Sequence, residues 1–196
     1  ITGGAGFIGS HTALVLLEAG HQLVVLDSYA NSSPEALRRV AELAGPEAAT
    51  RLQVIEGDIR SEQDLNQAFT ASSALGGKPA DAVIHFAGLK AVGESVAEPL
   101  RYWDVNLSGS RQLVGAMQAH RCRTLVFSSS ATLYGYPETV PIPETATIAP
   151  INPYGHSKAA VEQLLADVAA SESGWRIARL RYFNPVGAHP SGRIGE

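Results

Sequence analysis

Short apolar segments alternate with longer segments of helical periodicity along the whole chain, and this alternation limits the possible folds more than any other feature. The segments with strand character are residues 22–26, 52–55, 82–86, 124–128 and 177–182. The segments with helical character are residues 10–19, 34–44, a stretch from Ser61, 98–120 and 154–170. Strands that alternate with helices imply right-handed crossovers. The sequence therefore predicts an α/β fold with one doubly wound parallel sheet and helices on both faces.

The composition fits a chain with a sizeable core and excludes several functional classes. Hydrophobic residues make up 45% of the 196 positions and charged residues 17%, which excludes intrinsic disorder. The net charge is -4, and no long cluster of lysine and arginine occurs. This excludes the positively charged surface stripe of a nucleic-acid-binding protein. No apolar run approaches the ~20 residues of a membrane span. Because the single cysteine, Cys122, cannot form an internal disulfide, we expect a cytoplasmic protein.

A glycine-rich turn lies where the first helix begins. Gly3, Gly6 and Gly9 are spaced three residues apart, so backbone N–H groups and the positive helix end can hold a pyrophosphate. Asp27 ends the next strand, where a carboxylate accepts hydrogen bonds from the ribose hydroxyls of NAD and repels the extra phosphate of NADP. The alternative interpretation is a structural turn followed by an Asp that caps a helix. The motif and its spacing favour a dinucleotide site.

Two further strand ends carry residues at the same edge of the predicted sheet. Asp58 and Ile59 follow one strand, and Phe86 and Lys90 belong to the turn after the next strand. Ligands of open α/β sheets bind at this carboxyl edge. Asp58 is suited to contact an adenine amine, and it is equally suited to form a turn.

The start of the last long helix places a phenol and an ammonium four residues apart, on one helix face. These groups are Tyr154 and Lys158. A phenol is a poor base at neutral pH unless a nearby cation stabilises its phenolate, so the pair suits proton abstraction from an alcohol. Ser130 ends the preceding strand and can reach the same substrate oxygen. A surface pair without function is the alternative, which the glycine motif upstream disfavours.

An irregular stretch with five prolines, residues 131–153, separates that serine from the helix. Segments of this length without regular structure are more often functional than idle. The histidines His85, His120 and His189 lack metal-ligand spacing, so we expect no metal site.

The glycine motif, the serine and the Tyr-x-x-x-Lys pair resemble the extended short-chain dehydrogenase/reductase superfamily. Residues 85–95, 128–135 and 181–188 resemble its UDP-glucose 4-epimerase family. The resemblance implies a Rossmann-type NAD-binding fold and an isomerase of galactose metabolism. It further implies that NAD⁺ takes hydride from C4 of a UDP-hexose while Tyr154 takes the 4-hydroxyl proton, after which the 4-keto sugar turns over and hydride returns to its opposite face.

The same resemblance implies roles for individual residues. The catalytic set is Tyr154, with Ser130 hydrogen-bonded to the C4 oxygen and Lys158 both binding the nicotinamide ribose and lowering the pKa of Tyr154. The implied cofactor-binding residues are Gly3, Gly6, Phe7, Ile8, Gly9, Asp27, Asn31, Ser32, Asp58, Ile59, Phe86, Ala87, Gly88, Lys90, Asn106, Ser128, Tyr154, Lys158, Tyr182 and Phe183. The implied substrate-binding residues are Lys90, Ser130, Ala131, Thr132, Tyr154 and Asn184.

Related activities differ at two positions. Sugar-nucleotide 4,6-dehydratases of the superfamily carry Asp-Glu directly after the Ser/Thr, where this chain has Ala131 and Thr132. Decarboxylating relatives keep a Glu at the second position. A sister sugar-nucleotide epimerase and a non-catalytic NAD-binding module remain as alternatives.

The family's chain begins with an apolar strand before the glycine turn and continues into a smaller domain that grips the uridine. We therefore expect residues 1–196 to be an NAD-binding Rossmann domain truncated at both ends, without most of its first strand and without the substrate domain. The last ~15 residues would lead toward that domain. The resemblance also implies a homodimer that pairs helices 98–120 and 154–170.

Overall fold

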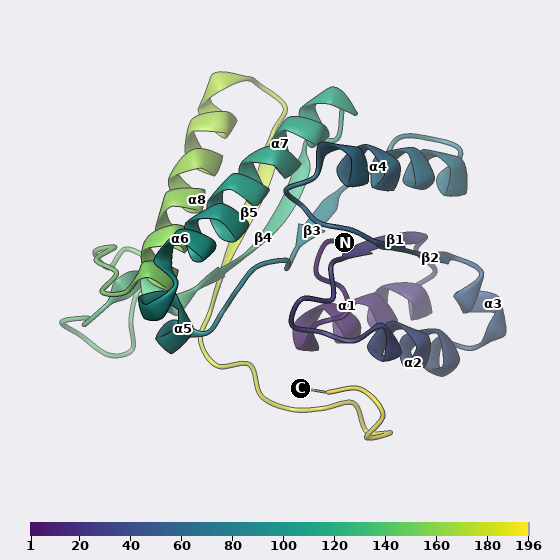
Figure 1. Cartoon of the computed structure of the whole chain (residues 1–196), viewed down its shortest axis with the longest axis horizontal. Helices are drawn as coiled ribbons and strands as arrows, with labels where there is room; N and C mark the ends of the chain where they lie inside the picture. The colour runs from purple at the N-terminus through teal and green to yellow at the C-terminus, as the bar shows by residue number, and fades with distance from the viewer. Residues whose placement is uncertain (196) are drawn as a thin grey trace.

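The computed structural model describes residues 1–195 and contains a twisted parallel sheet with helices packed around it (Figure 1). Its strands are β1 (Leu23–Asp27), β2 (Leu52–Glu56), β3 (Val83–His85), β4 (Thr124–Ser130) and β5 (Arg176–Tyr182). β1 pairs with β2, and β4 lies between β3 and β5, in each case in parallel. The predicted parallel α/β fold is confirmed, and the five predicted strands agree with the observed ones to within two residues at either end.

The helices follow the predicted order, with differences at their ends. They are α1 (Phe7–Glu18), α2 (Pro34–Ala44), α3 (Pro46–Ala49), α4 (Glu62–Gly76), α5 (Val92–Ala97), α6 (Pro99–Tyr102), the π-helix η1 (Trp103–Ser108), α7 (Gly109–Ala119), the 3-10 helix η2 (Ala131–Tyr134) and α8 (Pro153–Ser171). The predicted helix 98–120 is three helices in succession, two α-helices with the π-helix η1 between them. Gly45-Pro46 ends α2 as expected, but proline also suits a first helical position and so starts the one-turn α3.

The side chains of β1 alternate between two cores, because successive strand residues point to opposite faces. Leu23 packs with α1 and α2, whereas Leu26 belongs to the main core, to which α4, α7 and α8 contribute. Helices therefore cover both faces of the sheet, α1 and α2 on one and α4, α7 and α8 on the other (Figure 1).

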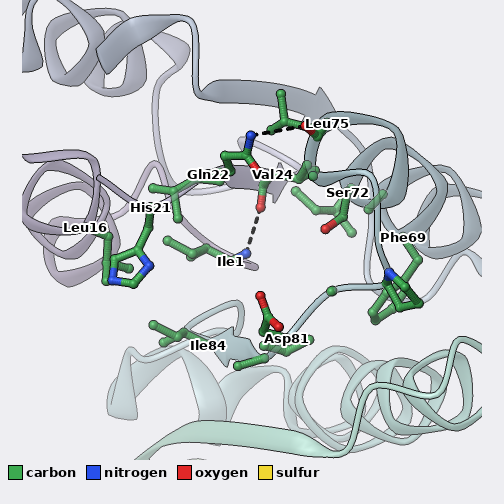
Figure 2. Close-up of a pocket in the computed structure, with 18 of the residues that line it drawn as sticks. Ile1, Leu16, His21, Gln22, Val24, Phe69, Ser72, Leu75, Asp81 and Ile84 are labelled. Atoms are coloured by element: carbon green, nitrogen blue, oxygen red, sulfur yellow. Dashed lines mark hydrogen bonds between the residues drawn. The ribbon is translucent and has the colours of Figure 1, made fainter. Parts of the chain in front are cut away.

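The two parts of the sheet meet at Thr2. This residue forms isolated parallel bridges to Leu26 in β1 and to His85 in β3. Beside it lies a cavity of about 690 Å³ between β1, β3 and α4, into which the buried amino group of Ile1 points and donates to the Val24 carbonyl at 2.7 Å (Figure 2). Thr2 thus joins β1 to β3 within the described residues.

The segment after β4 contains only η2 as regular structure, as the prolines predict. Its far end returns to η2, where the Ala149 N–H donates to the Leu133 carbonyl at 2.9 Å. The C-terminal segment, residues 183–195, runs back toward α1 and α2, and Ile194 is buried against them. The sheet edge is therefore flanked by two irregular segments. Within the described residues, no helix has the length and apolarity that crossing a membrane demands.

Candidate active site

A cavity of about 1090 Å³ opens at the carboxyl ends of the strands. Its lining includes the glycine turn, the ends of β1 and β2, the turn after β3, the end of β4, the start of α8 and residues 182–185. All residues predicted to bind cofactor or substrate line it except Asn106 and Ala131. Segments that are far apart in the sequence are thus brought to one site by the parallel sheet, whose carboxyl ends share an edge.

The glycine turn is tightly packed at two of its three glycines. Gly3 has φ +70°, and a Cβ there would lie 2.4 Å from the Ala87 nitrogen. A Cβ at Gly9 would lie 2.3 Å from the Gly3 carbonyl oxygen. Gly6 is the N-cap of α1, without a side-chain cap and without an acidic residue in the first turn. The first N–H groups of α1 therefore keep free donors beside the cavity, which suits an anionic group.

Asp27 joins this turn to the end of β1. Its Oδ2 accepts the Ala5 N–H at 2.8 Å, and its Oδ1 accepts the Tyr29 N–H at 3.0 Å and the Ser32 hydroxyl at 2.8 Å. The interpretation of Asp27 as a helix cap is wrong, because Ser33 caps α2 by accepting the Glu35 N–H. The carboxylate is instead fixed beside the glycine turn, at the edge of the cavity.

Asp58 forms a turn with Arg60, as one of its two interpretations predicts. The Arg60 guanidinium donates to its carboxylate at 2.6 Å, and the backbone N–H of Arg60 donates at 2.8 Å. These bonds lower the pKa of Asp58, against an opposing effect of burial. Arg60 also pairs with Asp104 of η1 at 2.6 Å. Asp58 lines the cavity, but its carboxylate is already engaged.

Tyr154, Lys158 and Ser130 come together as predicted. α8 begins at Pro153 because Asn152 caps it, accepting the Gly155 N–H at 2.8 Å, and this places both side chains on its buried face. The Ser130 hydroxyl lies close enough to the Tyr154 phenol to act against the rise of its pKa. The Ser130 oxygen also accepts a hydrogen bond from the Thr132 hydroxyl at 2.8 Å, which orients both hydroxyls.

Burial is the largest influence on the pKa values of Lys158 and Tyr154. Its ammonium donates to the Ser128 carbonyl at 2.9 Å and lies 4.8 Å from the centre of the Phe127 ring. Burial lowers the pKa of Lys158 to about 8. Burial also raises the pKa of Tyr154, and the bond from Ser130 only partly offsets this. The effect of Lys158 on the Tyr154 pKa stays a prediction.

Asn106 and Ala131 do not line the cavity, and their contacts with cofactor and substrate stay predictions. Asn106 is buried in η1, where its Oδ1 accepts the Leu89 N–H at 2.8 Å and its Nδ2 donates to the Ser157 hydroxyl at 3.0 Å. Both ends of the amide are thus used within the protein. π-helices occur frequently at functional sites. Here the π-helix carries the side chain that fastens the turn after β3 to α8.

One aromatic neighbour of the site was missed by the sequence reasoning. Tyr102 is fully buried and packs edge-on against the ring of Tyr154, with ring centres 6.4 Å apart. Its hydroxyl donates to the Ala91 carbonyl and to the Glu94 carboxylate, both at 2.7 Å. No local motif marks Tyr102, because the contact joins a helix before β4 to the helix after it.

His85 is a structural residue, as expected. Its ring nitrogens hydrogen-bond the hydroxyls of Thr2 at 2.6 Å and Ser110 at 2.9 Å. Burial, together with the charge of Lys158, lowers its pKa to about 3, so the ring is neutral. In the part of the chain that the structure describes, no group of three or more His, Cys, Asp or Glu side chains is placed to hold a metal ion.

Comparisons with known proteins agree with this geometry. The family model described as "NAD dependent epimerase/dehydratase family" matches residues 1–195. The chain is 50% identical over 196 residues to the UDP-glucose 4-epimerase of Bacillus subtilis, of which it covers 55%. It is 50% identical, again over its full length, to the bifunctional UDP-glucose 4-epimerase and UDP-xylose 4-epimerase 3 of Arabidopsis thaliana, of which it covers 54%. It spans about half the length of these curated relatives.

Solved structures show the same relationship. The UDP-glucose 4-epimerase of Stenotrophomonas maltophila, with bound NAD and formylated UDP-arabinopyranose, superposes with a TM-score of 0.91 at 46% identity. The enzyme of Bifidobacterium longum, in complex with NAD⁺ and UDP, superposes with a TM-score of 0.90 at 46% identity. Both matches cover 100% of this chain, and 55% and 56% of the respective structures. The chain belongs to the NAD-dependent epimerase/dehydratase family.

Proposed function

We propose that the protein interconverts UDP-glucose and UDP-galactose by transient oxidation at C4 of the hexose, with NAD as its tightly bound cofactor. The observation that carries the proposal is one cavity lined both by a dinucleotide-type glycine turn and by the side chains of Ser130, Tyr154 and Lys158. Relatives whose sequences are 53% and 50% identical to this chain are UDP-glucose 4-epimerases, which supports the same activity. Residues 1–196 would form its NAD-binding domain, and the uridine contacts would lie outside it.

The residues of the cavity fit NAD. The free N–H groups at the start of α1 suit its pyrophosphate, because no side chain caps this helix end. Asp27 is fixed where its carboxylate can accept the ribose hydroxyls and repel the phosphate of NADP. Tyr182 and Phe183 line the same cavity on the opposite side. When bound there, NAD⁺ supplies a hydride acceptor for C4 and a positive charge that favours the phenolate of Tyr154.

Tyr154 is the proposed base. Its phenolate oxygen takes the proton of the 4-hydroxyl as the C4 oxygen becomes a carbonyl, and it returns this proton when the carbonyl is reduced from the opposite face. Ser130 orients the C4 oxygen, because its hydroxyl already meets the phenol. No proton is lost or gained over the cycle, as an isomerisation requires.

Lys158 is the proposed ribose contact and charge partner. Its ammonium lines the cavity and is fully buried, held by the Ser128 carbonyl. A buried cation near the phenol favours the phenolate over the neutral phenol. This role requires the Lys158 side chain to remain charged, which its pKa of about 8 allows at neutral pH.

Two alternatives are less well supported. A dehydratase needs an acid and a base beside the serine, whereas Ala131 and Thr132 carry no carboxylate and Thr132 donates to Ser130 instead. A non-catalytic NAD-binding module has no need for a phenol, a serine hydroxyl and a buried ammonium that line the same cavity. A sister sugar-nucleotide epimerase would share this site and differ in the sugar pocket.

The decisive test incubates the purified full-length protein with UDP-galactose and follows the formation of UDP-glucose. We expect turnover, and we expect Tyr154→Phe to keep NAD bound while losing most of the rate. Bound NAD without any turnover would contradict the enzyme proposal. An unchanged rate in Tyr154→Phe would show that Tyr154 is not the base.

We also propose that the protein is a homodimer. Apolar side chains are exposed on α5, α6 and η1, with Leu100 82% and Val96 64% exposed. Contiguous exposed apolar residues often mark an interface. Sedimentation of the full-length protein tests this, with the double variant Val96→Glu/Leu100→Glu expected to be monomeric.

A further inference from the structure

Three side chains on the buried face of α8 form one stripe that contacts the end of β4. Tyr154, Lys158 and Glu162 are spaced four residues apart, so they lie above one another on the helix. Tyr154 lies close to the hydroxyl of Ser130, and Lys158 donates to the carbonyl of Ser128 at 2.9 Å. The stripe therefore fixes α8 against three successive strand residues, 128–130, and its third member remains without a role in the proposed reaction.

Glu162 contacts the remaining one of these residues. It is 2% exposed, and its Oε1 accepts the Ser129 hydroxyl at 2.6 Å. Arg181 lies opposite Ser129 in the parallel pair of β4 and β5, and its guanidinium donates to both carboxylate oxygens at 2.7 to 3.2 Å. Burial raises the pKa of Glu162, but the bonds from Arg181 and Ser129 outweigh it, so the pKa is lowered and the carboxylate stays charged. Neither Glu162 nor Arg181 lines the cavity.

Arg181 extends the contact to the irregular segment after β4. Its Nη1 donates to the Tyr134 hydroxyl at 2.8 Å and to the Glu144 carbonyl at 3.2 Å. Its guanidinium carbon lies 5.2 Å from the centre of the Tyr134 ring. A single guanidinium thus links α8, β5 and the segment that follows Ser130.

A buried ion pair is weak evidence for a role in stability. Taking two charges out of water costs free energy, and apolar residues of similar volume often serve as well or better. A pair with several directed bonds to separate elements does specify their relative positions, because each bond has a narrow range of distance and angle. The relative placement of α8, β4 and β5 is therefore a better explanation for the Glu162–Arg181 pair than stability.

We propose that Glu162 and Arg181 are positioning residues, which set α8 against β4 so that Tyr154 meets Ser130 and which hold the segment 135–152 beside them. The proposal rests on the proposed function for its effect on turnover. The pair acts through Ser129 and Tyr134 and touches neither substrate nor cofactor.

The main test compares two arginines of β5 in the full-length protein. Arg181→Gln removes the bonds to Glu162, Tyr134 and Glu144, and we expect kcat to fall by about 10- to 100-fold with unchanged NAD affinity. Arg179→Gln is the matched control, because Arg179 lies 3.8 Å from Glu162 on the same strand and is 43% exposed. Its kcat should stay at the parent level. Equal effects of the two substitutions would overturn the proposal.

Two further variants separate positioning from folding. Ser129→Ala removes only one hydroxyl and should lower kcat without changing the KM for UDP-galactose. The double variant Glu162→Leu/Arg181→Met replaces the charges by apolar groups, so the melting temperature should recover relative to Arg181→Gln. We expect its kcat to remain low. Recovery of kcat together with the melting temperature would show that the pair is merely structural.

A titration of the Tyr154 phenol tests the proposal without any turnover. The pKa is measured as the pH dependence of phenolate absorbance, by difference between each protein and its Tyr154→Phe form. In Glu162→Leu, loss of the charge alone would lower the Tyr154 pKa, whereas loss of the Ser130 bond would raise it. A rise supports positioning, and a fall or no change overturns it. Failure of the unaltered protein to convert UDP-galactose would reject the proposed function and leave this readout intact.

Discussion

Replacing Lys158 by Met should remove a pH-dependent cost that the buried ammonium imposes on folding. Burial lowers the pKa of Lys158 from 10.5 to about 8 in the folded protein. That difference corresponds to about 3 kcal/mol when the lysine is charged in both states. The unfolded chain binds more protons between pH 8 and 10.5, so the cost is complete below about pH 8 and disappears as the pH rises through this window.

The measured quantity is the difference in unfolding free energy between Lys158→Met and the parent protein. From about pH 6.5 to about pH 9.5 the advantage of the variant should shrink by about 2 kcal/mol, while groups common to both proteins cancel. Urea unfolding followed by the fluorescence of Trp175, which packs against the main core, gives both values.

Lys78→Met is the matched control, since Lys78 is 62% exposed and pairs with Asp81 at the surface. Its effect should stay below about 1 kcal/mol at both pH values. If the parent and Lys158→Met curves run parallel over this range, Lys158 does not fold as a desolvated cation and the reasoning is refuted. We also expect Lys158→Met to be inactive, because the charge that destabilises the fold is the one the reaction uses.

Three further predictions concern the cofactor side. Gly9→Ala would place a Cβ 2.3 Å from a backbone oxygen and should lower the unfolding free energy by about 2 kcal/mol or more. The control is Gly93→Ala, whose Cβ would have no atom within 4 Å, and urea unfolding should show it to be neutral or stabilising. Asp27→Asn should narrow the preference for NAD over NADP, measured by calorimetric titration of both cofactors; an unchanged ratio would contradict its assigned role. Asn106→Ala leaves the Leu89 N–H without its acceptor and should cost about 2 kcal/mol, with faster hydrogen exchange in the turn after β3.

Local patterns were sufficient for most of the fold. Strand character at residues 22–26 and helical spacing in residues 34–44 predicted β1 and α2 closely, because buried parallel strands are continuously apolar and caps such as Ser33 are local signals. The π-helix η1 was not predicted, since its hydrogen-bond pattern depends on where Asn106 meets the turn after β3 and α8.

The sequence likewise predicted one part of the candidate site and not another. Its chemical groups were readable because the glycine spacing, Tyr154 and Lys158 each belong to one short segment. Their electrostatics were not, because the pKa of a phenol depends on burial and on which acceptor the neighbouring ammonium chooses, here the Ser128 carbonyl. The roles of Asn106 and Tyr102 likewise depended on contacts across the sheet.

The sequence by itself determined the parallel α/β fold, the glycine turn with Asp27, and the Ser130, Tyr154 and Lys158 set, since periodicity and short motifs express local backbone preferences. Only the tertiary structure decided that Lys158 turns to β4, that Asn106 works as an internal fastener, and that Glu162 and Arg181 lock α8 to β4 and β5. These facts depend on which distant side chains meet. Local sequence patterns do not specify which residues from distant segments come into contact.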